Sequence, residues 1–296
     1  IPLRLVGSEM CIRDRVLATG GPGMVKAAYS SGTPALGVGA GNAVITVDES
    51  ADLDEAAEKI RISKTLDLAA SCSSDNSVVA VDSIYDALLQ KLIEQGGHLA
   101  SGDDYQKIAA VLWKDGHLNS KAVVLKPQVL CKMAGVEIPD DRLFIIIPET
   151  GVGPEHPYSG EMLSVIMAFY RVPDIDAAVA LTNSIQTYQG MGHSCGIYSN
   201  NDENILKLGL GTKTSRIMVN QPQSSSNSGN LWNGMRQTFS LGCGTWGGNS
   251  TNENINWEHL VNITWISKPL ATPKTLPADE ELFGNVIEQL KVESVA

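Results

Sequence analysis

Short apolar runs alternate with longer amphipathic stretches along most of the chain. Apolar runs bounded by Gly, Pro or Asn are typical of buried strands, and apolar residues spaced three or four apart are typical of helices. The predicted strands are 16–19, 34–36, 43–47, 78–81, 143–147, 163–170, 196–198 and 217–219. The predicted helices are 24–31, 50–66, one starting with a capping box at 83–86, one after residue 101, 129–134, 174–183 and 204–210. This order predicts an α/β fold with a mostly parallel sheet.

Two segments break this pattern. Residues 220–256 are rich in Ser, Asn and Gly and contain Trp232 and Trp246. They are too long for a simple connector, and long loops of this kind are functional or disordered. Residues 271–296 are predicted to form a loosely held acidic tail with one amphipathic turn around Leu282.

Composition narrows the possible partners. The chain has 296 residues, 43% of them hydrophobic, so it can bury a large core. Its net charge of −11 argues against nucleic acid and anionic membrane surfaces as partners. The five cysteines are far apart, and neither a signal peptide nor an apolar run of membrane length is visible, so we expect a reducing cytoplasm and neither a disulfide framework nor a metal site.

Cys72 is the candidate nucleophile. It lies among small and hydroxyl residues, after an amphipathic helix and before an apolar strand, where a helix end can expose a thiol. A thiol with a pKa of roughly 8.5 reacts only where its thiolate is stabilised, and backbone N–H groups at a helix end can do this. The alternative is a small buried hydrophobe, which is the commoner role of a cysteine.

Two glycine clusters flank predicted strands. Gly20 and Gly21 begin a turn between a strand and a helix, where backbone N–H groups can approach a phosphate, although a plain tight turn is as common. The second cluster, 37–41, favours close approach of the backbone to a ligand or another strand.

These features together resemble the CoA-acylating aldehyde dehydrogenases. The resemblance covers about 16–270 and depends on the order of motifs that are weak singly. The motifs are ATGG at 18–21, MVKAAYSSG at 24–32, ALGVG at 35–39, KMAGVEIP at 132–139, GVGPEHP at 151–157, GHSC at 192–195 and GCGTWGGN at 242–249. Within the family, SCSS at 71–74, NQPQ at 220–223 and DEELFG at 279–284 are most similar to the acylating sulfoacetaldehyde dehydrogenases.

The resemblance implies a reaction in which a small aldehyde, CoA and NAD or NADP give an acyl-CoA. Cys72 would form a thiohemiacetal and then a thioester, and its backbone N–H would be one oxyanion donor. Glu161 matches the glutamate that holds the nicotinamide ribose, although without the family it reads as a solvated loop charge. Thr19, Gly20 and Gly21 would contribute to cofactor binding.

The resemblance also implies a domain plan, an aldehyde dehydrogenase-like fold with a three-layer α/β/α catalytic domain. Residues 1–15 resemble adapter-derived sequence and are excluded as a leader. Residues 16–45 would be the end of a Rossmann-type cofactor domain, 46–250 the catalytic domain, and 251–296 a segment that helps a homo-oligomer to form. On this plan most of the cofactor domain, including a second oxyanion donor, would lie upstream of the chain.

One missing residue type separates acylating from hydrolytic relatives. Hydrolysis of the thioester needs a general base, which hydrolytic relatives carry in the segment corresponding to 37–41. No acidic residue occurs from 27 to 47, so CoA is the favoured acceptor, although another base could act. A CoA-independent dehydrogenase and an inactive oligomerising scaffold are the alternatives.

Three further residues are weaker candidates. His193 could line the active-site mouth or contact substrate, or it could be a hydrogen-bonded structural residue, and His156 is assigned to loop architecture. Cys243 is the rival nucleophile.

The cations carry a similar ambiguity. Lys26, Lys64, Arg216 and Arg236 could bind a sulfonate or a CoA phosphate, or could be surface cations. Two departures from the family pattern affect the positioning of the thiol: Leu68 stands where relatives commonly have Asn, and Asp75 where many have Glu.

Overall fold

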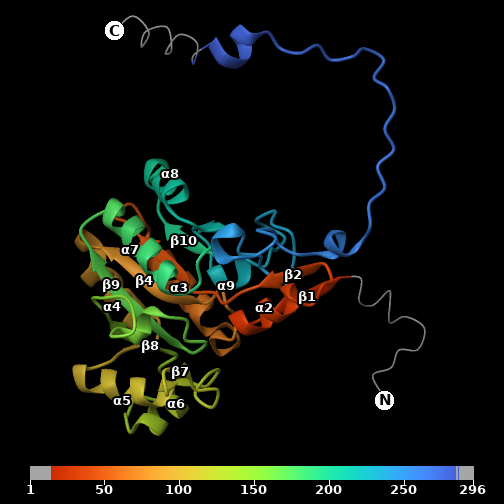
Figure 1. The fold of residues 1–296 in the computed structure, drawn as a ribbon. Coiled ribbons are helices and arrows are strands. Elements are labelled where there is room, and N and C mark those ends of the chain that lie inside the picture. Colours follow the sequence, from red (N-terminus) through yellow and green to blue (C-terminus); the bar gives the residue numbers. More distant parts are fainter. Residues whose placement is uncertain (1–14, 285, 287–296) are drawn as a thin grey trace, which may run out of the picture. The chain divides into compact units, whose positions relative to one another are not determined.

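The computed structural model describes residues 15–284 and 286, and the chain divides into two units, 1–260 and 261–296. Seven strands of the first unit form one sheet in the order β11-β10-β3-β4-β9-β8-β5 (Figure 1). They are β3 (Ala43–Val47), β4 (Asp75–Val81), β5 (Gly97–Leu99), β8 (Phe144–Pro148), β9 (Ile166–Val172), β10 (Cys195–Tyr198) and β11 (Ile217–Val219). Every neighbouring pair is parallel, as the sequence predicts.

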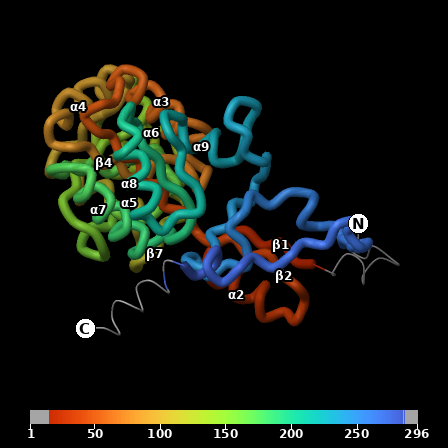
Figure 2. The backbone as a smooth tube through the Cα atoms, turned by 90° about the horizontal axis from the view of Figure 1, so that it is seen from above, coloured from red at the N-terminus to blue at the C-terminus, as the bar shows by residue number. Residues whose placement is uncertain are grey.

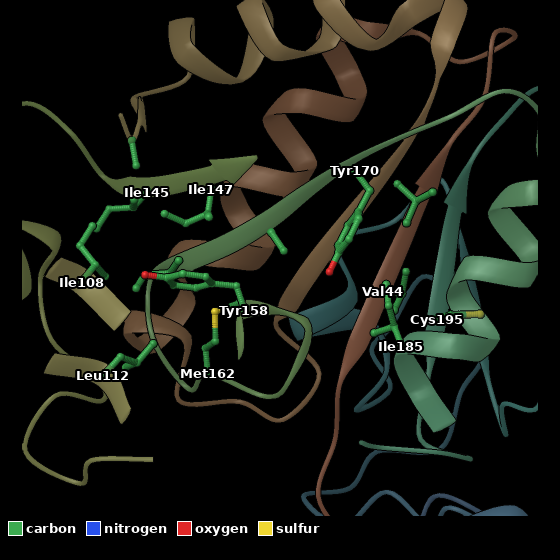
Figure 3. Packing of buried hydrophobic residues seen from close by; sticks show 14 of the residues in the cluster. Val44, Ile108, Leu112, Ile145, Ile147, Tyr158, Met162, Tyr170, Ile185 and Cys195 are labelled. Atoms are coloured by element: carbon green, nitrogen blue, oxygen red, sulfur yellow. The ribbon is translucent and has the colours of Figure 1, made fainter. Parts of the chain in front are cut away.

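Helices cover both faces of this sheet because its strands are apolar on both sides. Val44 and Val79 face one layer, and their neighbours Ile45 and Val78 face the other. The first layer contains α5 (Gly102–Leu112), α6 (Pro127–Ala134), α7 (Ile175–Tyr188) and α8 (Asp202–Gly211), and Figure 3 shows its packing. The second contains α3 (Leu53–Thr65) and α4 (Tyr85–Glu94). The predicted three-layer α/β/α fold is confirmed.

A smaller parallel sheet precedes the large one. β1 (Val16–Thr19) and β2 (Ala35–Val38) pair in parallel and are joined by α2 (Pro22–Tyr29), which gives the predicted βαβ unit (Figure 2). At Gly37 a Cβ would lie 2.7 Å from a Val25 methyl carbon. Glycine is therefore needed for α2 to pack on β2.

The start of helix α4 differs from the sequence prediction. The capping box predicted at 83–86 is wrong, because α4 has Ile84 at its N-cap with no side-chain cap. The capping box is formed instead by Ser101 and Asp104 at the start of α5. Ser83 and Asp86 have the same spacing as Ser101 and Asp104. However, residues 82–84 form a 3₁₀ turn before α4 begins, so Ser83 is not at the N-cap.

Several short elements were not predicted. They are β5, the antiparallel pair β6 (Trp113–Lys114) and β7 (His117–Leu118), and α9 (Gln223–Ser226). Single 3₁₀ turns are η1 (Leu66–Ala69), η2 (Asp82–Ile84), η3 (Pro157–Ser159), η4 (Thr245–Gly247) and η5 (Trp257–Leu260). The rest of 220–256 is irregular, as expected from its composition.

The second unit is described separately. It is extended up to the helical residues 279–284, where the sequence predicts an amphipathic turn. Apart from Arg15, the predicted leader lies outside the described residues. None of the helices in the described ranges has the length and apolar character needed to cross a membrane.

Candidate functional site

The candidate residues gather at the edge of the large sheet where its strands begin. Gly41, Cys72, Glu161 and His193 precede β3, β4, β9 and β10 respectively. Because the amino ends of neighbouring parallel strands meet at one edge, the topology brings together residues up to 152 positions apart.

The Cys72 thiol faces a histidine. His193 Nε2 lies 3.1 Å from Cys72 Sγ, and the imidazole is completely buried. Burial, aided by the charge of Arg216, lowers the pKa of His193 to about 3. The imidazole is therefore neutral at physiological pH, with one nitrogen free to accept a proton. The structure thus places His193 against the Cys72 thiol, a contact that its sequence interpretations did not include.

The thiol itself is half-buried and protonated. Burial raises the pKa of Cys72 to about 12, and the nearby Glu161 and Cys243 add to the rise. The Cys72 backbone N–H and Arg216 act in the opposite direction but are weaker. The expectation of a thiolate stabilised at an exposed helix end is wrong for this chain, because desolvation dominates.

The backbone before Cys72 is strained. Asp67, Leu68 and Ala69 have φ values of 47°, 53° and 61°, so three consecutive non-glycine residues adopt the left-handed conformation. Each such residue costs about 1–2 kcal/mol relative to a right-handed one. Asn tolerates this conformation better than Leu, so Leu68 adds to the strain of the loop.

Gly41 contacts both Cys72 and Glu161. Its N–H donates to Glu161 Oε1 over 3.3 Å, and a Cβ at Gly41 would lie 2.3 Å from the Cys72 carbonyl oxygen. Burial raises the pKa of Glu161 to about 7. The loop charge read from sequence is therefore a largely buried carboxyl group beside the site.

Arg216 ties the site to the glycine-rich loop. Its guanidinium donates to the carbonyl oxygens of His193, Gly242 and Asn252 over 3.0, 2.8 and 2.9 Å. Both interpretations from sequence, an anion ligand and a surface cation, are wrong, because Arg216 is buried and holds backbone groups. Cys243, the rival nucleophile, is buried in the same loop.

A pocket of about 720 Å³ opens beside the site between α2, the end of α7 and the loop 243–249. Lys26 and Cys243 line it, and so does Gln186, whose buried carboxamide oxygen has no hydrogen-bond partner within the described chain. A ligand with polar N–H or O–H groups fits this lining, as a nicotinamide nucleotide or the pantetheine arm of CoA would.

The other predicted cofactor residues lie at the border of this pocket. Thr19 ends β1, Gly20 and Gly21 form the turn to α2, and the pocket lining starts at the next residue, Pro22. The Thr19 hydroxyl is paired with Ser240 Oγ at 2.9 Å.

Three other candidates are either buried or paired with another side chain. Lys64 is neither a surface lysine nor an anion ligand, because it is completely buried. Burial lowers the pKa of Lys64 to about 7, although the nearby charge of Asp75 acts in the opposite direction. Burial also raises the pKa of Asp75 to about 7. Arg236 pairs with Glu258 at an exposed position. His156 contacts Glu149 over 2.7 Å in its loop, in keeping with the architectural assignment.

Comparison with known proteins identifies the family, although no family model matches the chain. An acylating sulfoacetaldehyde dehydrogenase from Cupriavidus necator is 40% identical over 274 residues, which are 92% of this chain and 55% of the relative. An acetylating aldehyde dehydrogenase from Geobacillus thermoglucosidasius superposes with a TM-score of 0.83 at 37% identity, over 88% of this chain and 58% of that one. The chain belongs to the acylating aldehyde dehydrogenases.

A more distant member of the acylating aldehyde dehydrogenases has been solved with bound CoA and an acylated cysteine. This propionaldehyde dehydrogenase from Rhodopseudomonas palustris is 26% identical, with a TM-score of 0.70 over 80% of this chain and 53% of that one. The chain spans little more than half the length of each of these relatives.

Proposed function

We propose that the chain contributes the catalytic cysteine of an enzyme that oxidises a small aldehyde to an acyl-CoA. The observation that carries this proposal is the 3.1 Å contact between Cys72 Sγ and His193 Nε2. A neutral imidazole at this distance can take the thiol proton as the sulfur attacks the aldehyde carbon. Because burial disfavours both the thiolate and the imidazolium, proton transfer accompanies attack and no ion pair forms beforehand.

The second half of the reaction reuses the same pair. Once the thiohemiacetal has been oxidised to a thioester on Cys72, His193 releases the first proton to solvent. The CoA thiol then gives its proton to the neutral His193 and attacks the carbonyl carbon. Cys72 leaves as the thiolate and takes that proton back from His193. Gly41 packs against Cys72, and none of the residues 37–41 carries a carboxylate that could activate water from that side, which favours CoA over water as acceptor.

The cofactor in this proposal is NAD or NADP, which would accept a hydride from the thiohemiacetal. Glu161 would hold the ribose hydroxyls, and the turn of Thr19, Gly20 and Gly21 would approach the phosphates. Glu161 suits this role because its carboxyl group is near enough to act on the Cys72 thiol yet accepts one weak hydrogen bond, from Gly41, within the part of the chain that the structure describes.

The substrate class in this proposal is a small aldehyde, with sulfoacetaldehyde first. The name of the Cupriavidus necator relative and the SCSS, NQPQ and DEELFG motifs support this choice. Lys26 is a cation in the pocket lining that could attract an anionic group of substrate or CoA. The enzyme would work as a homo-oligomer in the cytoplasm.

The test is NAD(P)H formation from sulfoacetaldehyde and other small aldehydes, measured with and without CoA. Cys72→Ala should lower CoA-dependent formation at least about 10³-fold, because the covalent route is lost. Cys131→Ala is the matched control, since Cys131 is buried in the core cluster on α6 and should leave the rate unchanged. Full activity in Cys72→Ala, or equal rates with and without CoA, would overturn the proposal.

A further inference from the structure

The second ring nitrogen of His193 also has a partner. His193 Nδ1 lies 2.8 Å from Ser194 Oγ, and both residues are completely buried. The contacts form one line of three groups: the Cys72 thiol, the His193 imidazole and the Ser194 hydroxyl. The acylation chemistry described above uses only the first two.

A neutral imidazole carries its proton on one nitrogen and a lone pair on the other. To accept the thiol proton, Nε2 must be unprotonated, so the ring proton must lie on Nδ1. A buried Nδ1–H needs an acceptor, because an unpaired buried donor costs about 1–3 kcal/mol. The Ser194 hydroxyl oxygen is the acceptor found at this nitrogen among the described residues.

We propose that Ser194 is the positioning residue that holds His193 in the tautomer with Nε2 free to accept a proton from Cys72. The inference rests on the proposed role of His193 as the base. Without the Ser194 oxygen, the alternative tautomer would direct an Nε2–H at the thiol, and proton acceptance would be blocked.

A hydroxyl suits this position better than a carboxylate. Ser194 can accept from Nδ1–H in the neutral ring and equally in the imidazolium that forms when Nε2 takes the thiol proton. A carboxylate could also accept, but it would add a buried charge to a site where Glu161 and Cys243 already disfavour the thiolate. The titratable groups that act on the pair are Glu161, Cys243 and Arg216.

The backbone around Ser194 is fixed from two sides. Its carbonyl oxygen accepts from Gln186 Nε2 on α7 over 2.7 Å, and Arg216 holds the carbonyl of His193 over 3.0 Å. The next residue, Cys195, begins β10. The backbone that carries the hydroxyl is thus held by helix α7, by strand β10 and by Arg216. A rigid support of this kind is the condition for orienting an imidazole.

The test is alkylation of Cys72 by iodoacetamide as a function of pH in the 296-residue chain, followed on the Cys72 peptide by mass spectrometry. Ser194→Ala should slow alkylation near neutral pH roughly tenfold, the lower end of what loss of an orienting partner of a functional histidine does. It should also move the alkylation profile to higher pH. Ser194→Thr retains the hydroxyl and should restore both.

A matched control and a second readout separate orientation from stability. Ser77→Ala removes another completely buried hydroxyl, one without a hydrogen-bond partner in the described residues, and should leave the alkylation profile unchanged. The ¹⁵N shifts of the imidazole should show the proton on Nδ1 in the wild-type chain and a mixture of tautomers in Ser194→Ala.

Two outcomes would overturn the inference: a wild-type alkylation profile in Ser194→Ala, or a wild-type tautomer in that variant. Neither readout needs turnover. If Ser194→Ala changes both while no CoA-dependent NAD(P)H is formed by the wild type, the proposed function fails and the positioning role stands.

Discussion

Strand β3 has a cluster of buried polar groups at each end, and the two clusters differ in hydrogen bonding. Just after the strand, buried Asp48 accepts from the Ser50 N–H and hydroxyl, from Ser199 Oγ and from Asn204 Nδ2, over 2.5–2.9 Å. Just before it, Glu161 accepts from the Gly41 N–H over 3.3 Å, and the Cys72 thiol has His193 as its one hydrogen-bond partner within the described residues.

The difference separates a structural cluster from a reactive one. The Asp48 carboxylate has a donor for each of its hydrogen-bonding positions and holds loops together. Groups that are buried with few partners have shifted pKa values, as Cys72, His193 and Glu161 do. Such groups cost stability and are retained where they carry out chemistry.

The largest change in unfolding free energy is expected at Asp48, in the structural cluster that follows β3. Asp48→Ala would leave buried donors of Ser199 and Asn204 without their acceptor, so we expect a loss of about 3 kcal/mol of unfolding free energy. Urea unfolding measures it. Glu155→Ala, at an exposed loop position, is the control and should change stability by less than about 0.5 kcal/mol. Equal effects of the two would break the comparison.

A substitution at Glu161, in the reactive cluster that precedes β3, is expected to raise the unfolding free energy instead of lowering it. Burial raises the pKa of Glu161 from 4.5 to about 7, so the folded chain binds this proton more tightly than the unfolded chain. The stability that the bound proton contributes is complete below about pH 4.5 and is lost as the pH rises through 7. Glu161→Gln removes this loss and should be about 2 kcal/mol more stable than wild type at pH 8.

The pH dependence is the check on Glu161. Urea unfolding at pH 4 and pH 8 should show the advantage of Glu161→Gln at pH 8 and little of it at pH 4. A variant that is less stable than wild type at pH 8 would mean that the carboxylate is satisfied, as Asp48 is.

The smallest effect concerns the strained turn before Cys72. Ala69→Gly removes the Cβ from a residue with a φ of 61° and should stabilise the chain by about 1 kcal/mol or less. The same substitution at Ala109, inside helix α5, should destabilise it by about 1 kcal/mol. Thermal unfolding compares the two, and destabilisation by both would contradict the strain.

The fold was largely predictable because buried strands are apolar on both faces. The runs at β3, β4 and β8 could bury both faces only in a sheet covered by two helix layers. β5 has only three residues, and α9 lies in a polar segment, so neither has a detectable period. Their positions depend on tertiary contacts.

The site was predictable in part. Cys72 was visible from its setting, but its contact with His193 joins residues 121 positions apart and depends on strand order. The burial of Lys64 did have a signal, because it follows Ala57 and Ile60 on the buried stripe of α3. The sequence interpretation instead followed the positive charge of Lys64, which is typical of a surface residue or an anion ligand.

The central claim is that Cys72 carries the acyl group, and it can be tested without a nicotinamide cofactor. The chain is incubated with an acyl-CoA, and its peptides are mapped by mass spectrometry. Acyl transfer from CoA to Cys72 should add the acyl mass to the Cys72 peptide and release free CoA, and Cys72→Ala should abolish both. An acyl group found on Cys243, or none on Cys72 in the folded chain, would contradict the account.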